Sequence, residues 1–203
     1  MRPCRLGVLL SGRGSNFVAL HQAIQAGIVN QAEIVVVISN RPEAPGLDLA
    51  REFGLNTIAL NAKQSASRAA RDTSLRTLLA EHAVDVLLLA GYDRIIGPEL
   101  LAAYPGRILN IHPSLLPAYG GNGMVGHTVH AAVLANGETE SGCTVHLVTE
   151  IVDGGAILGQ SRVPVYPEDT VDVLAARVLK EEHCLYPRIV NDFIREYSTV
   201  PQG

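Results

Sequence analysis

The feature that most constrains the fold of this chain is the alternation of short apolar runs with helical stretches along its first half. The run at 33–38 (EIVVVI) is the clearest, because its five consecutive β-branched residues favour extended backbone. Five strands are predicted in this part of the chain, at 5–10, 33–38, 56–60, 85–90 and 106–111. Helices are predicted between them, at 15–27, 42–54 and 66–83. Strands joined through helices by right-handed crossovers pair in parallel, so the pattern predicts a twisted parallel sheet.

The second half of the chain changes character and is predicted to form an antiparallel hairpin. Two extended runs, at 141–148 and 156–165, flank a turn that contains Asp153, Gly154 and Gly155. Asp-Gly is the usual signal of a hairpin turn. Two helices are predicted to follow, at about 170–185 and at 187–196.

Together these patterns predict a single α/β, Rossmann-like domain over residues 1–203, with a mainly parallel twisted sheet, helices on both faces and a C-terminal antiparallel hairpin. Hydrophobic residues make up 47% of the chain, which is enough for a core without disulfide or metal staples. A net charge of −4 disfavours nucleic-acid binding, and no apolar run approaches the ~20 residues that span a bilayer. The three cysteines are odd in number and far apart, so reduced thiols and a cytoplasmic location are expected.

A glycine-rich turn follows the first strand, at the place where a helix start offers free backbone N–H groups to an anion. It is not a dinucleotide site, because the third glycine of that fingerprint is Phe17 and no acidic residue follows the second strand. No nicotinamide cofactor is therefore expected. A single phosphate, bound by the amides of Gly14, Ser15 and Asn16, fits the turn better. The local pattern favours equally an ordinary tight turn with Ser15 as the N-cap.

Asn110 and His112 lie at the carboxyl end of the fifth strand, where open α/β sheets place their chemistry. Strand alternation puts both side chains on one face, with Cα atoms about 7 Å apart. An amide there can stabilise an oxyanion, and an imidazole can relay a proton. The alternative, with similar weight from the pattern, is a core histidine beside a strand-end asparagine.

Asp153 has two interpretations as well. A carboxylate near His112 would raise the pKa of the imidazole, hold it protonated and order a water for proton transfer. From the local pattern alone, Asp153 is a hairpin-turn residue.

Four segments decide between these alternatives: SGRGSN, LAGYDRII, NIHPSLLP and GCTVHLVTEIVDGGAIL. In this order and at these spacings they resemble the folate-dependent formyltransferase family, and within it the branch that formylates 5′-phosphoribosylglycinamide. The resemblance extends from Leu6 to about Pro187. It implies a one-carbon group transferase of purine biosynthesis whose co-substrate is 10-formyltetrahydrofolate. Residues 1–105 would form the phosphate-binding half, and residues 106–203 the catalytic and folate-binding half.

The resemblance also implies a role for each matched residue. Asn110, His112 and Asp153 correspond to the catalytic residues. The ribonucleotide would contact Gly14, Ser15, Asn16 and Glu182. The folate would contact Arg68, Asp93, Arg94, Ile95, Ile96, Asn110, Thr149, Glu150, Ile151 and Val152. Small molecules are thus the expected partners, with a monomer or weak homodimer as the expected assembly.

The chain departs from the family pattern in two places. The segment after NIHPSLLP is longer than usual, and its glycine-rich loop at 119–127 suits a lid over the cleft. Leu179 stands where relatives carry a polar side chain, with Lys180 as the candidate replacement.

Other functions compete with formyl transfer to the ribonucleotide. Relatives with the same Asn-His-Asp set hydrolyse formyltetrahydrofolate or formylate methionyl-tRNA or an amino sugar, normally with a further domain. A non-catalytic nucleotide-binding module would use the glycine turn alone. A zinc site at His127, His130 and His146 is disfavoured because no Cys or acid cluster joins them, so no metal is expected. His146 is interpreted as a packed neighbour and His130 as a supporting residue.

Overall fold

The computed structural model describes residues 2–61 and 65–197, and its centre is one seven-stranded sheet in the order β3-β2-β1-β4-β5-β6-β7. The strands are β1 (Cys4–Leu10), β2 (Ala32–Ser39), β3 (Thr57–Ala59), β4 (Val86–Leu89), β5 (Ile108–His112), β6 (Glu140–Leu147) and β7 (Ile157–Pro164). β1 to β5 pair in parallel, whereas β6 is antiparallel to both β5 and β7. The predicted mainly parallel sheet with a C-terminal antiparallel hairpin is therefore confirmed.

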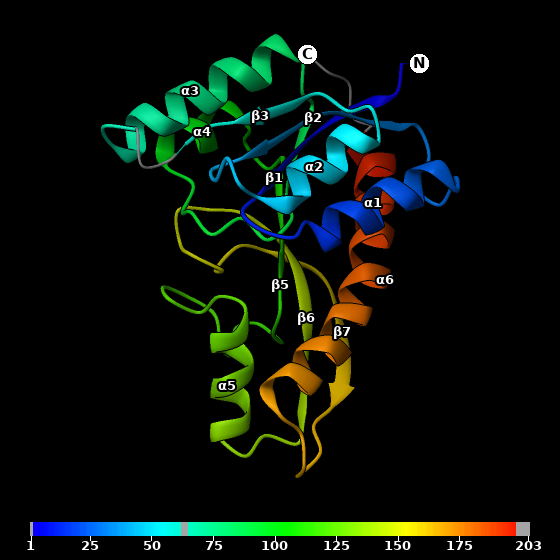
Figure 1. Cartoon of the computed structure of the whole chain (residues 1–203), viewed down its shortest axis with the longest axis vertical. Helices are drawn as coiled ribbons and strands as arrows, with labels where there is room; N and C mark the ends of the chain where they lie inside the picture. The colour runs from blue at the N-terminus through cyan, green and yellow to red at the C-terminus, as the bar shows by residue number, and fades with distance from the viewer. Residues whose placement is uncertain (1, 62–64, 198–203) are drawn as a thin grey trace.

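Helices cover both faces of the sheet, as predicted (Figure 1). The helices are α1 (Ser15–Gln25), α2 (Pro45–Glu52), α3 (Arg68–Glu81), α4 (Pro98–Ala103), α5 (His127–Ala135) and α6 (Val171–Tyr197). Residues of α1, α2 and α6 pack into one apolar core with inward-facing strand residues, and α3 and α4 pack into a second core on the opposite face. Among the described residues, no helix combines the length and apolar character that crossing a bilayer requires.

The C-terminal helix differs from the prediction, because α6 is one continuous helix and not two. Proline lacks the N–H of a helical hydrogen bond, which is why Pro187 predicts a break. The residues on both sides of it are nevertheless anchored in the core. Tyr186 is fully buried and donates its hydroxyl to the carbonyl oxygens of Leu89 and Leu109 at 3.1 Å each. Packing against the sheet thus outweighs the lost hydrogen bond.

The start of α1 also differs from one alternative, in which Ser15 caps the helix. The N-cap is Gly14, with φ 76°, and no side chain caps the free N–H groups. This backbone conformation favours glycine. A Cβ atom at Gly14 would lie 2.9 Å from the Cα atom of Gly46, so the two backbones approach more closely than a side chain allows. The turn therefore presents uncapped helix amides.

Candidate active site

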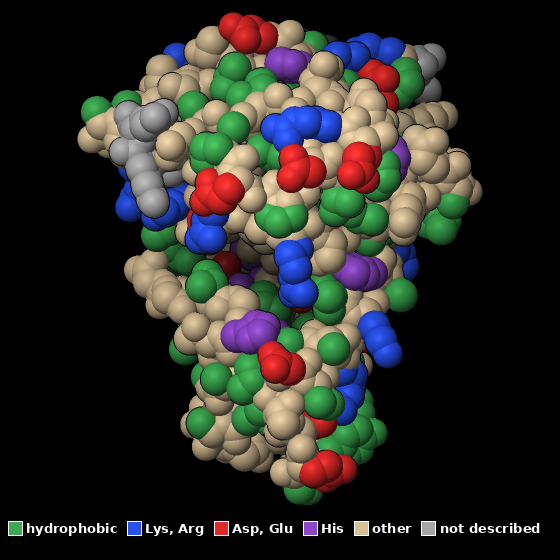
Figure 2. Space-filling view, in the orientation of Figure 1, with side chains coloured by type: hydrophobic (Ala, Val, Ile, Leu, Met, Phe, Trp, Pro, Cys, Tyr) green, Lys and Arg blue, Asp and Glu red, His purple; other side chains and the backbone are tan. Residues whose placement is uncertain are grey.

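A cavity of about 560 Å³ opens at the carboxyl ends of β1, β4 and β5, the edge at which parallel sheets place ligands. Its walls come from the strand ends, the glycine-rich loop and the connection between β6 and β7. Figure 2 shows the surface hollowed on one face, with acidic and histidine side chains inside the hollow. Asn110, His112 and Asp153 all line the cavity, so the structure brings the predicted catalytic residues together.

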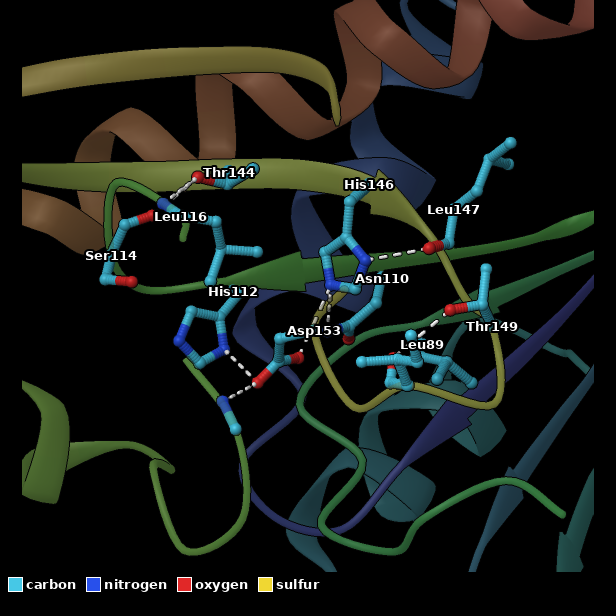
Figure 3. Close-up of polar contacts among 12 residues, drawn as sticks. Leu89, Asn110, His112, Ser114, Leu116, Thr144, His146, Leu147, Thr149 and Asp153 are labelled. Atoms are coloured by element: carbon cyan, nitrogen blue, oxygen red, sulfur yellow. Dashed lines mark hydrogen bonds and ion pairs between the residues drawn. The ribbon is translucent and has the colours of Figure 1, made fainter. Parts of the chain in front are cut away.

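The Nδ1 atom of His112, at the end of β5, lies 3.6 Å from the Oδ2 atom of Asp153 in the β6–β7 connection (Figure 3). The Nε2 atom of His112 lies 2.9 Å from the carbonyl oxygen of Tyr119. Because a carbonyl can only accept, Nε2 carries the proton and Nδ1 faces the carboxylate. The N–H of Gly121 donates to the same Oδ2 atom at 2.9 Å. The glycine-rich loop therefore holds both members of the pair.

The charge on His112 differs from the expectation that the carboxylate keeps it protonated. Burial lowers the pKa of His112 below its ordinary value, and Asp153 and the Tyr119 carbonyl raise it only in part. His112 is therefore neutral at pH 7, with a free lone pair at Nδ1. Burial raises the pKa of Asp153, but its polar contacts, the Gly121 N–H among them, outweigh burial, so this pKa lies below its ordinary value and the carboxylate is charged.

His146 belongs to the same cluster, although the sequence suggested only a packed neighbour. Its Nδ1 atom lies 2.9 Å from the carbonyl oxygen of Leu147, so Nδ1 carries the proton and Nε2 accepts from the Asn110 amide at 3.1 Å. The Oδ1 atom of Asp153 lies 3.5 Å from the same Nε2 atom. In Figure 3 the two histidine rings point toward Asp153 from neighbouring strands. His146 thus fixes the amide orientation of Asn110.

A signal for His146 lies in the pairing of β5 with β6, which sets it directly opposite Asn110. Alternation within one strand tells which residues share a face, but not which residue of the next strand stands opposite. The register across the two strands was therefore the missing information.

The predicted ribonucleotide residues meet at a second place, outside the cavity walls. Asn16 on α1 donates its amide to the carboxyl group of Glu182 on α6 at 2.5 Å, and both side chains are buried. Burial raises the pKa of Glu182, partly offset by Asn16. The Asn16 Oδ1 atom is buried without a hydrogen-bond partner among the described residues. Two side chains 166 positions apart thus meet in one buried contact.

The predicted folate residues divide into two groups. Asp93, Arg94, Ile95, Ile96, Asn110, Thr149 and Val152 line the cavity. Arg68, Glu150 and Ile151 are exposed and lie outside its walls. Asp93 accepts from the hydroxyl of Ser11 and the amide of Asn40 at 3.0 and 2.8 Å and pairs with Arg41. Despite burial, these contacts lower its pKa, so Asp93 organises the cavity edge as a charged carboxylate.

The three histidines considered for zinc lie in different surroundings. His127 faces Asp172 on the surface, with 3.5 Å between the ring nitrogen and the carboxylate. Burial, with smaller effects from His127 and His112, lowers the pKa of His130 to about 4. Among the described residues, no group of three or more His, Cys, Asp or Glu side chains is arranged to hold a metal ion.

This fold and this site define an α/β enzyme with an acid–base cluster at the carboxyl edge of its sheet. The family model described as "Formyl transferase" matches residues 4–190, and the chain belongs to this family. The family assignment made from the four sequence segments is confirmed.

Relatives and solved structures agree with this assignment. The chain is 42% identical over 186 residues to phosphoribosylglycinamide formyltransferase of Escherichia coli (strain K12), covering 92% of this chain and 85% of that protein. It is 44% identical over 193 residues to the chloroplastic phosphoribosylglycinamide formyltransferase of Arabidopsis thaliana, over 95% of this chain. It spans only 66% of that plant protein and 62% of the one from Vigna unguiculata. The crystal structure of glycinamide ribonucleotide transformylase 1 from Symbiobacterium toebii matches with a TM-score of 0.91 at 41% identity, covering 96% of this chain and 89% of that one.

Proposed function

We propose that this protein transfers the formyl group of 10-formyltetrahydrofolate to the amine of 5′-phosphoribosylglycinamide, a step of purine biosynthesis. The observation that carries the proposal is the convergence of Asn110, His112 and Asp153 on one cavity in a chain of the formyl transferase family. The names of the relatives support this acceptor. A volume of about 560 Å³ also lies within the usual range for small-molecule sites.

The reaction begins when the acceptor amine attacks the formyl carbon and the carbonyl oxygen becomes an oxyanion. One N–H of the Asn110 amide is bonded to His146, and the second is available to the oxyanion. Donors already oriented before the charge develops contribute most to such catalysis. Asn110 is therefore the oxyanion donor, and His146 is its positioning residue.

His112 takes the proton that the attacking amine releases. Its neutral Nδ1 atom has a lone pair, and the charged Asp153 beside it stabilises the imidazolium that forms. The proton then passes, through Asp153 and an ordered water, to the folate nitrogen, and the bond between that nitrogen and the formyl carbon breaks. The formyl group ends on the amine, and tetrahydrofolate leaves. The step needs no metal or nicotinamide, because the amine itself is the nucleophile.

The two substrates occupy neighbouring regions. We assign the folate ring to the cavity wall formed by residues 93–96, 149 and 152, with Arg68, Glu150 and Ile151 outside it toward solvent. The phosphate binds at the uncapped amides of Gly14, Ser15 and Asn16. Glu182 binds the ribose. Residues 1–105 thus supply phosphate binding, and residues 106–203 supply most of the catalytic site.

The proposed partners are these two small molecules, with no role for nucleic acid or membrane. We propose a cytoplasmic protein that acts as a monomer or weak homodimer.

A turnover assay tests the function. The purified protein is given the formyl folate with and without the ribonucleotide, and tetrahydrofolate, formylated product and free formate are measured. Formylated product in equal amount to tetrahydrofolate, formed only with the ribonucleotide, is expected. Formate release at the same rate without the ribonucleotide would identify a hydrolase. No consumption of the folate would indicate a non-catalytic nucleotide-binding module.

A further inference from the structure

A buried ion pair lies behind the wall of the cavity that we assign to the folate. Arg71 and Asp72, in the first turns of α3, have side chains only 8% and 0% exposed. The guanidinium contacts the Oδ1 atom of Asp72 at 2.9 Å through Nη2 and 3.2 Å through Nε. A buried pair of charges stabilises a fold no more than apolar side chains of similar volume, because its desolvation cost offsets the attraction. Stability alone therefore does not account for this pair.

Both members of the pair bind the backbone of one short segment. The Nη2 atom of Arg71 donates to the carbonyl oxygen of Ile95 at 2.5 Å. The N–H of Gly97 donates to the Oδ2 atom of Asp72 at 2.5 Å. Each charged side chain thus holds one end of the segment 95–97, which has no regular secondary structure before α4 begins at Pro98.

The held segment forms part of the cavity wall. Ile95 and Ile96 line the cavity, and the peptide that joins them is planar. When Arg71 fixes the Ile95 carbonyl on the α3 side, the N–H of Ile96 is fixed on the opposite side of the same plane. The pair therefore sets the orientation of backbone groups at the cavity without touching a ligand itself.

Gly97 shows how closely the carboxylate approaches. A Cβ atom at this position would overlap the Oδ2 atom of Asp72, and it would also meet the Cδ atom of Arg68 at 3.1 Å. The backbone there has φ −100°, which any residue adopts, so the constraint is contact and not conformation. Only glycine allows the carboxylate to reach the N–H of this residue.

We propose that Arg71 and Asp72 are positioning residues that hold the segment 95–97 in the shape that binds the formyl folate. The proposal rests on the proposed function for the identity of the ligand. It goes beyond that function by assigning a role in donor affinity to two side chains outside the cavity.

The first test is Arg71→Lys, which keeps a positive charge beside Asp72 but cannot reproduce the guanidinium contacts to both Asp72 and Ile95. We expect the KM for the formyl folate to rise about five- to tenfold, the size of one lost hydrogen bond, with the KM for the ribonucleotide unchanged. The matched control is Arg107→Lys. Arg107 also donates to two carbonyl oxygens, those of Asp85 and Ala103. It directly precedes β5, however, so it lies at the amino end of this strand, whereas the cavity lies at the carboxyl end. This control should leave both KM values unchanged.

The second test is Gly97→Ala, which leaves every charge in place and displaces the segment by steric overlap. It should raise the folate KM in the same way, and melting temperatures of all variants show whether each one is folded. Equal increases for both substrates, or no change in either variant, would overturn the proposal.

A binding measurement separates this inference from the proposed function. Calorimetric titration with a folate analogue that carries no transferable formyl group should give a weaker Kd for Arg71→Lys than for the unmodified protein. If the unmodified protein binds the analogue but forms no product, the reaction assignment fails while the positioning role is still measured. If Arg71→Lys binds the analogue as tightly as the unmodified protein, the positioning role fails.

Discussion

The catalytic region and the predicted ribonucleotide region are built in opposite ways. In the first, Asn110, His112 and Asp153 line an open cavity and are oriented by neighbouring backbone groups and by His146. In the second, Asn16 and Glu182 are buried and bonded to each other, outside the cavity walls. The comparison teaches that the proposed reacting groups are already oriented around an open cavity, whereas Glu182, which we assign to the ribose, lies buried against Asn16.

The largest expected effect is on the preorganised side, at His112. Changing His112 to Ala removes the proposed proton acceptor, so kcat should fall by about 10²–10⁴-fold while both KM values change little. Steady-state kinetics measure this. The control is His21→Ala, because His21 stacks on Phe53 away from the cavity, with ring centroids 4.4 Å apart. Near-normal turnover of the His112 variant would remove this residue from the mechanism.

The next effect concerns the carboxylate that faces His112. Asp153 has φ 55°, which asparagine tolerates well, so Asp153→Asn should fold with a near-normal melting temperature. Loss of the negative charge should lower kcat by roughly 10²-fold, of the order of an acid–base contribution. The pKa of His112, already low through burial, should fall further, because an anion favours the protonated ring. NMR titration of the His112 ring checks this shift; an unmoved titration with normal turnover would contradict the coupling.

A smaller effect is expected on the ribonucleotide side, at Glu182. The change Glu182→Gln keeps a side chain of the same size beside Asn16 but removes the carboxyl group that we assign to the ribose. The KM for the ribonucleotide should rise by about tenfold, and the KM for the folate should not change. The control is the adjacent Glu181→Gln, since Glu181 accepts a hydrogen bond from Ser161 in the edge strand β7. Equal KM changes for both substrates would mean that Glu182 serves the fold.

The last prediction concerns stability and not activity, through a histidine that is buried as a neutral ring. Burial lowers the pKa of His130 to about 4, below the ordinary value of 6.5. As pH falls from 6.5 toward 4, the unfolded chain takes up a proton that the folded protein does not. For each pH unit by which the pH falls in that window, this histidine therefore lowers the free energy of unfolding by at most about 1.4 kcal/mol. Urea unfolding at several pH values gives the free energy of unfolding as a function of pH. This free energy should change less with pH for His130→Gln than for the unmodified protein, and an equal change would contradict the assignment.

The sequence predicted the elements whose signals are local. Each of the five strands in the first half lies within about two residues of its prediction, because runs such as 33–38 are apolar and β-branched. Two short helices, α4 and α5, fall outside the predictions. α4 has only six residues, fewer than two turns, so no helical periodicity develops. The continuity of α6 through Pro187 depends on packing in the core, which a local pattern does not report.

The candidate site likewise has residues that the sequence predicted and contacts that only the folded chain determines. Asn110 and His112 are two positions apart on one strand, so alternation places them on one face, and the family resemblance adds Asp153. The charge of His112 depends on burial, which is a property of the folded chain. The contacts of Tyr119 and Gly121 with the His–Asp pair depend on the path of the glycine-rich loop. Neither can be obtained from residue types.

The sequence by itself determined the α/β class, the edge of the sheet that carries the chemistry and the residue types available there, because these follow from periodicity and from short motifs. Tertiary structure alone decided the partners: His146 opposite Asn110, Glu182 against Asn16, and Arg71 and Asp72 behind the segment 95–97. The physical reason is distance along the chain. Hydrogen bonds and desolvation depend on which groups meet in space, and these groups come from segments that the sequence separates.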